Sequence, residues 1–451
     1  MNNMDEKNCY NKCGSKKNIS KAYKKIEEDS KYKSLYNSNV FYISGQTWPI
    51  GSSETITVGN TLTGDSVSKA IITDTKIENN HILHIIRRLY MKKYKISVYA
   101  ISKNEEKFVD RWYESMKEAD EIYVLDTGST DKTVKKLKEK GINVKSKKYD
   151  EFRFDVARND SLNLVSEDTD ICVCTDLDEV LEPGWREKIE KIWKENTTQL
   201  KYNYNWSLDE NGTPLVNFYI EKIHKRKGYK WYHPVHEILV PQNILENIIT
   251  TDSITLNHYP DKEKSRGSYL PLLELSVKED PQDDRNMHYL GREYMYYGKW
   301  NDCIDTLIKH LNLKNATWKD ERSASMRFIA RSYKNLKRYD EAKLWLDKAI
   351  KETPYLRDPY VERAILDYEL EDYISVIYYC NKALEIKHHE KTYINEVFSW
   401  DSTIYDLLSI SYYNYGKLEQ ALFYINEALK LNPKNIRLNN NKKFFLECMG
   451  I

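Results

Sequence analysis

Residues 169–178, with the sequence TDICVCTDLD, form an apolar run that ends in two carboxylates, Asp176 and Asp178. A short run of this kind, bounded by polar residues, is typical of a buried β-strand. Two similar runs lie upstream, KISVYAI at 95–101 and EIYVLD at 121–126. We therefore predict that these segments are strands of one sheet, and that the two acids lie where the last of them ends.

Helical patterns separate the predicted strands. Apolar residues recur at helical spacing in residues 104–119 and 154–165, and residues 129–140 begin with a Ser/Thr–Asp cap and end at Gly141. A further strand, INVKSKKY, is predicted at 142–149. Strands that alternate with helices predict a parallel α/β sheet covered on both faces. Ligands bind such sheets beyond the carboxyl ends of the strands, so polar residues there are candidate site residues.

The flanking segments predict further structure. Residues 199–260 contain aromatic, strand-like pieces that we expect to complete the sheet as a mixed sheet. Residues 1–94 form an N-terminal extension to which we assign no function. It has a Lys-rich start at 16–33, and a Gly/Ser/Thr-rich stretch at 44–66 that predicts short strands and turns. Residues 81–95 predict a short amphipathic helix leading into the next domain.

The C-terminal part is helical and repetitive. Ala349 and Ala383 are 34 residues apart, which is the period of the tetratricopeptide repeat. Ala383 and Ala428 are 45 apart, so an insertion of 11 residues at or near 388–398 interrupts the series. We predict an all-α, tetratricopeptide-like solenoid over residues 282–451. The surfaces of such solenoids bind protein or peptide partners or mediate self-association into homo-oligomers, and both uses stay open.

Composition and charge exclude several classes of protein. The chain has 70 Lys and Arg against 69 Asp and Glu, so no basic excess points to a nucleic-acid partner. No apolar run approaches the roughly 20 residues that span a bilayer, and the N-terminus lacks the apolar core of a secretory signal. The seven cysteines are scattered and odd in number, which favours reduced thiols and a cytoplasmic location. Cys172 and Cys174 would share one face of a strand, and we expect them to be core residues.

The pair Asp176 and Asp178 carries the sharpest chemical signal. Residues two apart lie on one side of an extended strand, so both carboxylates could face one cation. Hard oxygen ligands suit Mg²⁺ or Mn²⁺, which would bridge to a diphosphate and act as a Lewis acid on it. An Asp-x-Asp pair also occurs in many solvated acidic loops, so the pair alone is a weak signal.

The neighbouring strand ends strengthen this signal. Asp126 ends the second strand, and Gly128 and Ser129 then predict a tight turn whose backbone amides can meet a nucleotide. An ordinary strand–turn–helix cap explains the same residues equally well. Asn104 and Glu105 follow the first strand and lie on the same predicted rim.

Four motifs, in this order and with these gaps, resemble those of family 2 glycosyltransferases with the A-type nucleotide-diphospho-sugar fold (GT-A): ISKNEE, EIYVLDTGSTDKT, FDVARN and DICVCTDLDE. The resemblance implies a Rossmann-like catalytic domain at residues 95–265. The architecture, a catalytic domain followed by tetratricopeptide-like helices, also resembles that of bacterial protein and peptide glycosyltransferases. The resemblance therefore implies a nucleotide-sugar donor, most commonly UDP-linked, and a protein or peptide acceptor.

The resemblance also implies roles for the residues around the nucleotide. Asn104 and Asp126 would contact the nucleoside, with Glu105 and Ser129 beside them on the rim. Arg158 would contact the base. A salt bridge on the surface of its helix is the alternative for Arg158.

The metal ligands and the catalytic base are assigned in the same way. Asp176 would contact the ribose and the metal, Asp178 would be the main Mn²⁺ or Mg²⁺ ligand, and His258 is the candidate for a third metal ligand. The fold family is inverting, so a base must take the proton of an acceptor hydroxyl or thiol. We prefer Glu237 for this role, and Glu179 competes with it.

Several alternatives remain open. The acceptor could be a cell-surface glycan, or the chain could be an inactive scaffold built on its repeats. A nucleotidyltransferase would need a Gly-rich phosphate loop after the first strand, where this chain has SKNEEK, and no dinucleotide-binding motif follows any strand. Trp231 could stack on a sugar, although a large aromatic on a strand is more often core.

Overall fold

The structure is a computed structural model, in which the chain divides into two compact units, Met1–Lys93 and Tyr94–Ile451. The described residues are 40–44, 53–57, 67–78, 81–88, 94–209, 211–261, 267, 269–389 and 392–450. The predicted boundaries at residues 265 and 282 lie inside the second unit, and a division there stays a prediction.

The first unit contains an antiparallel four-stranded sheet of order β1-β4-β3-β2. Its strands are β1 (Val40–Ser44), β2 (Ser53–Thr57), β3 (Val67–Glu78) and β4 (His81–Arg88). The short strand predicted within residues 44–66 is confirmed by β2. The helix predicted at 81–95 is wrong for residues 81–88, which form β4 and pair with both β1 and β3. The Lys-rich start lies outside the described residues.

The second unit begins with a mixed eight-stranded sheet of order β7-β6-β5-β8-β11-β10-β14-β9. The parallel half comprises β5 (Ile96–Ser102), β6 (Glu121–Asp126), β7 (Asn143–Ser146) and β8 (Ile171–Cys174). The mixed half comprises β9 (Glu179–Leu181), β10 (Gln199–Leu208), β11 (Pro214–Lys225) and β14 (Ile248–His258). A separate hairpin joins β12 (Tyr229–Tyr232) to β13 (Ile238–Pro241). The predicted α/β sheet with a mixed second half is confirmed.

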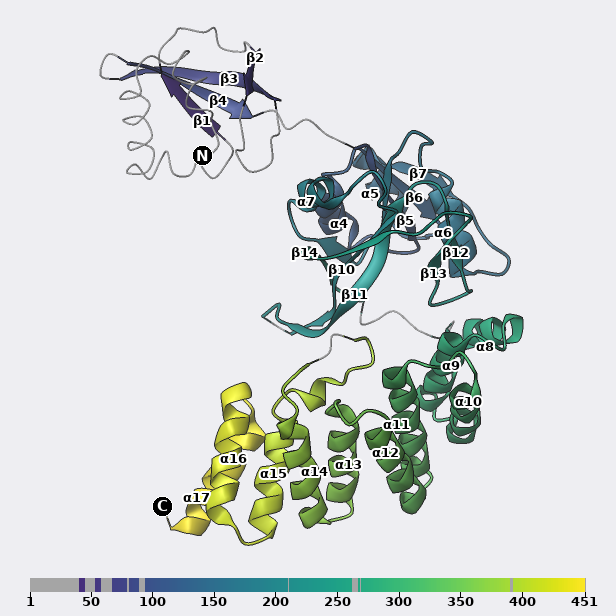
Figure 1. The fold of residues 1–451 in the computed structure, drawn as a ribbon, viewed down its shortest axis with the longest axis vertical. Coiled ribbons are helices and arrows are strands. Elements are labelled where there is room, and N and C mark those ends of the chain that lie inside the picture. Colours follow the sequence, from purple (N-terminus) through teal and green to yellow (C-terminus); the bar gives the residue numbers. More distant parts are fainter. Residues whose placement is uncertain are drawn as a thin grey trace. The chain divides into compact units, whose positions relative to one another are not determined.

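Helices cover both faces of this sheet (Figure 1). Helices α4 (Val109–Met116) and α7 (Trp185–Ile192) pack on the face that carries the alternate β5 residues 96, 98 and 100. Helix α5 (Thr133–Glu139) connects β6 to β7. Burial of Trp112 and Trp185, each fully inside the core, fixes the two helices of that face.

The opposite face of β5 packs on α6 (Phe154–Leu162). Tyr99 lies on this face in one cluster with Cys172, Cys174 and Trp231. The two thiols are buried, and burial raises the pKa of Cys172 to about 12 and that of Cys174 to about 11. The prediction that both cysteines belong to the core is confirmed.

A stack of helices follows the sheet (Figure 1). Its helices are α8 (Tyr269–Glu279), α9 (Asp284–Tyr296), α10 (Trp300–Asn312), α11 (Lys319–Asn335), α12 (Tyr339–Glu352), α13 (Asp358–Glu369), α14 (Tyr373–Glu385), α15 (Thr403–Asn414), α16 (Leu418–Leu431) and α17 (Ile436–Met449). The aligned residues Ala349, Ala383 and Ala428 are each fully buried. The predicted insertion is confirmed between α14 and α15, where residues 386–402 include the short helix η1 (Val397–Ser399).

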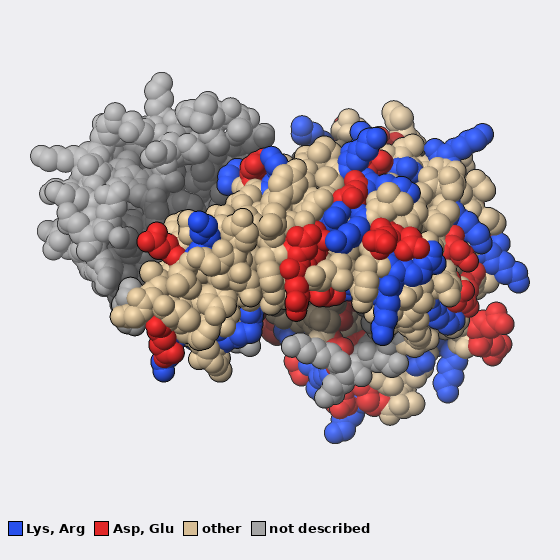
Figure 2. Space-filling view, turned by 90° about the horizontal axis from the view of Figure 1, so that it is seen from below, with Lys and Arg blue, Asp and Glu red and all other residues tan. Residues whose placement is uncertain are grey.

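The surface carries both signs of charge. On the face that Figure 2 presents, basic and acidic side chains are interspersed among the described residues. No helix within the described ranges combines the length and apolar character needed to cross a membrane.

The close packing of α9 on α10 gives a stability prediction. A Cβ on Gly291 would lie 2.3 Å from Cδ2 of Leu307, whose side chain is fully buried and cannot move away freely. Overpacking costs about 1–3 kcal/mol, which offsets or exceeds the roughly 1 kcal/mol that Ala gains over Gly in a helix. We expect Gly291→Ala to lower the free energy of unfolding of the helical part, measured by urea denaturation. In a Leu307→Ala background the same substitution should no longer destabilise, and an equal loss in both backgrounds would contradict this packing.

Candidate active site

The two acids of the Asp-Leu-Asp segment lie in a turn. Strand β8 ends at Cys174, and β9 begins at Glu179. Residues 177 and 178 form a turn, so the extended backbone that the sequence argument assumed for this pair is wrong. Asp176 and Asp178 are both partly exposed, and each has a different set of partners.

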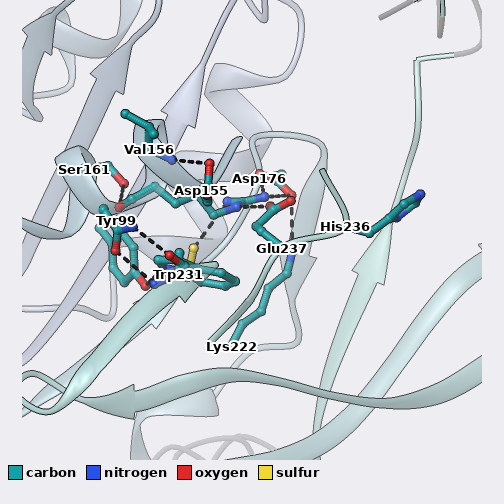
Figure 3. Close-up of polar contacts among 12 residues, drawn as sticks. Tyr99, Asp155, Val156, Ser161, Asp176, Lys222, Trp231, His236 and Glu237 are labelled. Carbon is teal, nitrogen blue, oxygen red and sulfur yellow. Dashed lines mark hydrogen bonds and ion pairs between the residues drawn. The ribbon is translucent and has the colours of Figure 1, made fainter. Parts of the chain in front are cut away.

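Asp176 lies against the buried guanidinium of Arg158. Nη2 of Arg158 donates to both oxygens of Asp176, at 2.9 and 3.0 Å, and its Nε donates to Oε1 of Glu237 (Figure 3). Arg158 is 4% exposed. The sequence-based alternative for Arg158, a surface salt bridge, is wrong, because this side chain joins the β8–β9 turn to the β12–β13 hairpin loop from inside the domain.

Lys222 on β11 is a second cation at this point, and the sequence analysis missed it. Its Nζ lies 3.2 Å from Oδ2 of Asp176 and 2.9 Å from Oε1 of Glu179. Burial would raise the pKa of Asp176, but the charges of Arg158 and Lys222 outweigh it and hold this pKa well below its usual value. An isolated Lys in a strand is ordinarily a solvated residue, so the sequence carried no signal for this contact.

Glu179 is enclosed by donors. It is 1% exposed, and its carboxylate accepts hydrogen bonds from the Tyr204 hydroxyl at 2.7 Å, from Lys222, and from the backbone N–H of Asp176 at 2.9 Å. A carboxylate saturated in this way supports the turn that carries Asp176. Glu237, at 10% side-chain exposure, shows only its contact through Oε1 to Arg158 among the hydrogen bonds of the described residues.

Asp178 faces His258 at the end of β14. Oδ2 of Asp178 lies 3.5 Å from Nε2 of His258, and Nδ1 of His258 lies 3.0 Å from the carbonyl oxygen of Trp206. Because a carbonyl only accepts, Nδ1 carries a proton, and in the neutral ring Nε2 then presents a lone pair to the carboxylate. Two acceptors in that arrangement need a proton or a cation between them. Burial lowers the pKa of His258, but the Asp178 carboxylate, the Trp206 carbonyl and Glu179 together raise it above its usual value.

Trp206 stacks on His258 and was missed by the sequence analysis. Its ring lies 4.5 Å from the imidazole, at an interplanar angle of 23°, and it is 46% exposed. Trp231, the aromatic that the sequence offered for sugar stacking, is 3% exposed and donates from Nε1 to the Tyr99 hydroxyl at 2.9 Å. Trp231 is therefore a core residue, and the exposed platform beside Asp178 is Trp206.

The rim residues after β5 and β6 form a hydrogen-bonded turn. The carboxylate of Asp126, 2% exposed, accepts from Ser102 Oγ at 3.3 Å, from Gly128 N–H at 3.1 Å and from Ser129. Asn104 has a positive φ of 57° and donates its N–H to Ser129 Oγ at 2.8 Å. The structure therefore brings these predicted nucleoside contacts together and gives Asp126 the capping role that the sequence left open.

Glu105 lies beside this turn, 8% exposed, with its N–H donating to Thr133 Oγ1 at 2.7 Å.

The two histidines of the segment KWYHPVHEIL, residues 230–239, make contacts outside the site. His236, labelled in Figure 3, points away from Asp176 and stacks on Tyr289 at 4.0 Å, and His233 lies 3.3 Å from Asp283. Both contacts are with the first helical repeat, which comprises Asp283, the N-cap residue of α9, and helices α9 and α10.

Comparison with protein families identifies this part of the chain. Residues 97–243 match Glycosyl transferase family 2, and residues 328–355 and 402–435 match tetratricopeptide repeats. The chain carries a family 2 glycosyl transferase domain followed by tetratricopeptide repeats. A comparison with curated proteins finds no match.

Solved structures similar to this chain include several tetratricopeptide-repeat proteins. Among them are a thermophilic TPR protein of Thermus thermophilus, TTC0263 (20% identity, 39% of this chain and 88% of that one, TM-score 0.29), and MamA (20%, 39% and 97%, 0.31). YrrB, described as a TPR protein with an unusual peptide-binding site, is 15% identical over 40% of this chain and 84% of its own, with a TM-score of 0.32.

The glycosyl transferase domain offers a metal two converging ligands. Asp178 and His258 face each other. All three of Asp176, Asp178 and His258 belong to the described residues, but their ligand atoms do not all lie within 4.8 Å of one another. Asp176 is neutralised by two cations. The residues therefore fit a cation held by Asp178 and His258, with the remaining positions left to a diphosphate and water, as Mg²⁺ sites commonly leave them.

The contacts of Lys222 generate a second prediction. Lys222→Met leaves Glu179 buried with one cation fewer, and breaking a buried ion pair costs about 3–5 kcal/mol at pH 7. Because the folded state depresses the pKa of Asp176, this residue stabilises the fold at pH values above its unfolded-state pKa. The stabilisation is lost progressively as the pH falls from there through the folded-state pKa. The difference between wild type and variant in denaturant melts should therefore shrink below about pH 4. Lys225→Met, an exposed Lys on the same strand, is the control and should cost little at any pH.

Proposed function

We propose that the domain transfers a sugar, with inversion, from a nucleotide-diphosphate sugar to a protein or peptide side chain. The family 2 match supports a glycosyl transferase that uses a nucleotide sugar. The observation that carries the finer proposal is the cluster of Asp176, Asp178, Arg158 and His258 at one end of the sheet, beside the exposed Trp206. A UDP-linked donor is proposed on the family resemblance.

The nucleotide half of the donor would bind along the rim formed by Asn104, Ser129 and Asp176. The turn after β6 is held by Asp126, so its backbone is fixed before a ligand arrives. Asp176 keeps its negative charge because Arg158 and Lys222 flank it, and a charged carboxylate can accept hydrogen bonds from ribose hydroxyls. The rim therefore binds the nucleoside without a large rearrangement.

A divalent cation, Mn²⁺ or Mg²⁺, would be held by Asp178 and His258, and when bound it would neutralise charge on the departing diphosphate. The proton on Nδ1 of His258 is fixed by the Trp206 carbonyl, which orients Nε2 toward Asp178. Trp206 offers its exposed face to the sugar. The four carboxylates at 176, 178, 179 and 237 outnumber the cations Arg158 and Lys222, which leaves a net negative charge that a divalent cation balances.

Glu237 is the base that we propose. Arg158 contacts its Oε1, which leaves Oε2 to accept the proton of the acceptor hydroxyl or thiol. Glu179 is enclosed by Tyr204, Lys222 and the backbone, which supports a positioning role for it. The acceptor oxygen or sulfur attacks the anomeric carbon from the face opposite the diphosphate. The bond between the anomeric carbon and the diphosphate oxygen breaks as the new bond forms, and the nucleoside diphosphate leaves.

A stripe of exposed apolar residues on the repeats supports a protein or peptide acceptor. Leu344 on α12, Tyr378 on α14 and Phe423 on α16 are 53%, 57% and 57% exposed. They are 34 and 45 residues apart, the same intervals that separate Ala349, Ala383 and Ala428, so they occupy one position of three repeats. Aromatic side chains exposed in register are typical of surfaces that bind other chains.

Replacement of Asp178 tests the catalytic proposal. We expect Asp178→Ala to lower Mn²⁺-dependent turnover of a panel of UDP-sugars by at least about 100-fold, the scale on which loss of one charge-stabilising group acts. Its thermal unfolding should stay close to that of wild type, because Asp178 is partly exposed. Glu182→Ala, an exposed acid four residues further on, should retain wild-type turnover. Full activity of the Asp178 variant would refute the site.

Replacement within the stripe tests the acceptor. Tyr378→Ser with Phe423→Ser should lower transfer to protein in a host lysate about tenfold or more, as expected where each aromatic contributes more than about 1 kcal/mol. Hydrolysis of the donor should be unchanged. Tyr415→Ser removes a tyrosine that is 55% exposed but lies outside the stripe, and it should leave both rates unaltered. Transfer that survives the double substitution would assign the acceptor to another surface, as a glycan acceptor would require.

A further inference from the structure

Three potential metal ligands meet inside the helical stack, outside the glycosyl transferase domain. Asp284 is in the first turn of α9, His310 in the last turn of α10 and Glu321 in the first turn of α11. One ligand atom from each of these residues lies within 4.8 Å of the others. Among the described residues no other group of three or more His, Cys, Asp or Glu side chains meets this condition.

His310 points an unpartnered nitrogen into this group. Its side chain is fully buried, and its Nε2 has no hydrogen-bond partner among the described residues, with Oε1 of Glu321 3.4 Å away. Its Nδ1 lies 3.0 Å from Ser325 Oγ, and the same hydroxyl lies 2.8 Å from Nδ1 of His288. The hydroxyl has one proton to donate, so one of these imidazoles must carry its proton on Nδ1. When that ring is His310, a bare lone pair on Nε2 faces two carboxylates.

Each of the three residues is also held by an outer hydrogen bond. Asn315 Nδ2 lies 3.2 Å from Oδ1 of Asp284, the Tyr393 hydroxyl donates to Oε2 of Glu321, and Ser325 holds Nδ1 of His310. Metal-binding histidines and carboxylates are characteristically fixed by such partners, which set the tautomer and the orientation of the ligand atom. The arrangement is therefore a built site, with every ligand positioned from outside.

We propose that Asp284, His310 and Glu321 bind a divalent transition-metal cation. Two carboxylates and a neutral imidazole carry two negative charges, which one divalent cation balances. Mixed imidazole and carboxylate ligands suit Zn²⁺ and Mn²⁺, and Zn²⁺ is the tighter binder of the two in the general order of affinities. The cation joins the ends of α9, α10 and α11. Through Tyr393 it also fixes residues of the insertion between α14 and α15.

The test uses the full chain carrying Asp178→Ala, so that the proposed catalytic site does not contribute. The chain is stripped with EDTA and loaded with Zn²⁺. Its metal content is measured after desalting, and its thermal unfolding is measured with and without free Zn²⁺ in the buffer. We expect one Zn²⁺ per chain and a rise in Tm of about 5–10 °C when free Zn²⁺ is a hundred times Kd. His310→Gln and Glu321→Gln should each remove both effects.

Two further variants keep the result decisive. His224→Gln removes an equally buried histidine of the sheet, whose ring nitrogens are both hydrogen-bonded, so it should lower Tm but keep the Zn²⁺-dependent rise. Asp284→Asn, at a partly exposed position, replaces His310→Gln if that chain does not fold. Zn²⁺ that stays bound in equal amount in the His310, Glu321 or Asp284 variants, or the absence of Zn²⁺ from the parent chain, would overturn the proposal.

Discussion

The guanidinium of Arg158 is the contact on which the geometry of the candidate site depends. It is buried, and it is shared by Asp176 in the β8–β9 turn and Glu237 in the β12–β13 loop. A buried charge is costly unless it is paired and hydrogen-bonded, and here Nε and Nη2 each have a carboxylate partner while Nη1 lies 3.4 Å from the Cys174 sulfur. Any movement of either loop would leave part of this charge unpaired. The two loops are therefore fixed relative to each other by α6, before any substrate binds.

Much of the glycosyl transferase sheet was predictable because the apolar pattern of each strand agrees with the burial of that strand in the folded sheet. The apolar runs that form β5, β6 and β8 are buried on both faces, and such strands keep a nearly continuous apolar pattern. Residues 81–88 show where this fails. Their isoleucines fit a helical or an extended segment equally well, and pairing with β1 and β3, which one sequence does not reveal, decides in favour of a strand.

The site itself was predictable as a set of acids but not as a network. Asp176, Asp178 and Arg158 follow from their motifs, whereas Lys222 and Trp206 come from β11 and β10, whose register against the rest of the sheet no local pattern fixes. The same limit explains why the sequence suggested Trp231 for sugar stacking, whereas the exposed aromatic is Trp206. Both are large aromatics on strands, and only the packing of α6 and β12 shows that Trp231 is enclosed while Trp206 faces outward.

The helical repeats contact the loop that carries the proposed base. His236 and His233 both have positive φ, which is strained for residues with a side chain, and the first repeat is what holds them. His236 stacks on Tyr289, its carbonyl accepts from Arg285 at 3.2 Å, and Val235 is buried in one cluster with residues of α8 and α9. Glu237 is thus held on one side by Arg158 and, through its neighbour His236, by the first repeat on the other. A chain that binds an acceptor on its repeats would gain from this arrangement, because the helices that begin the repeat stack also orient the carboxylate proposed to take the acceptor's proton.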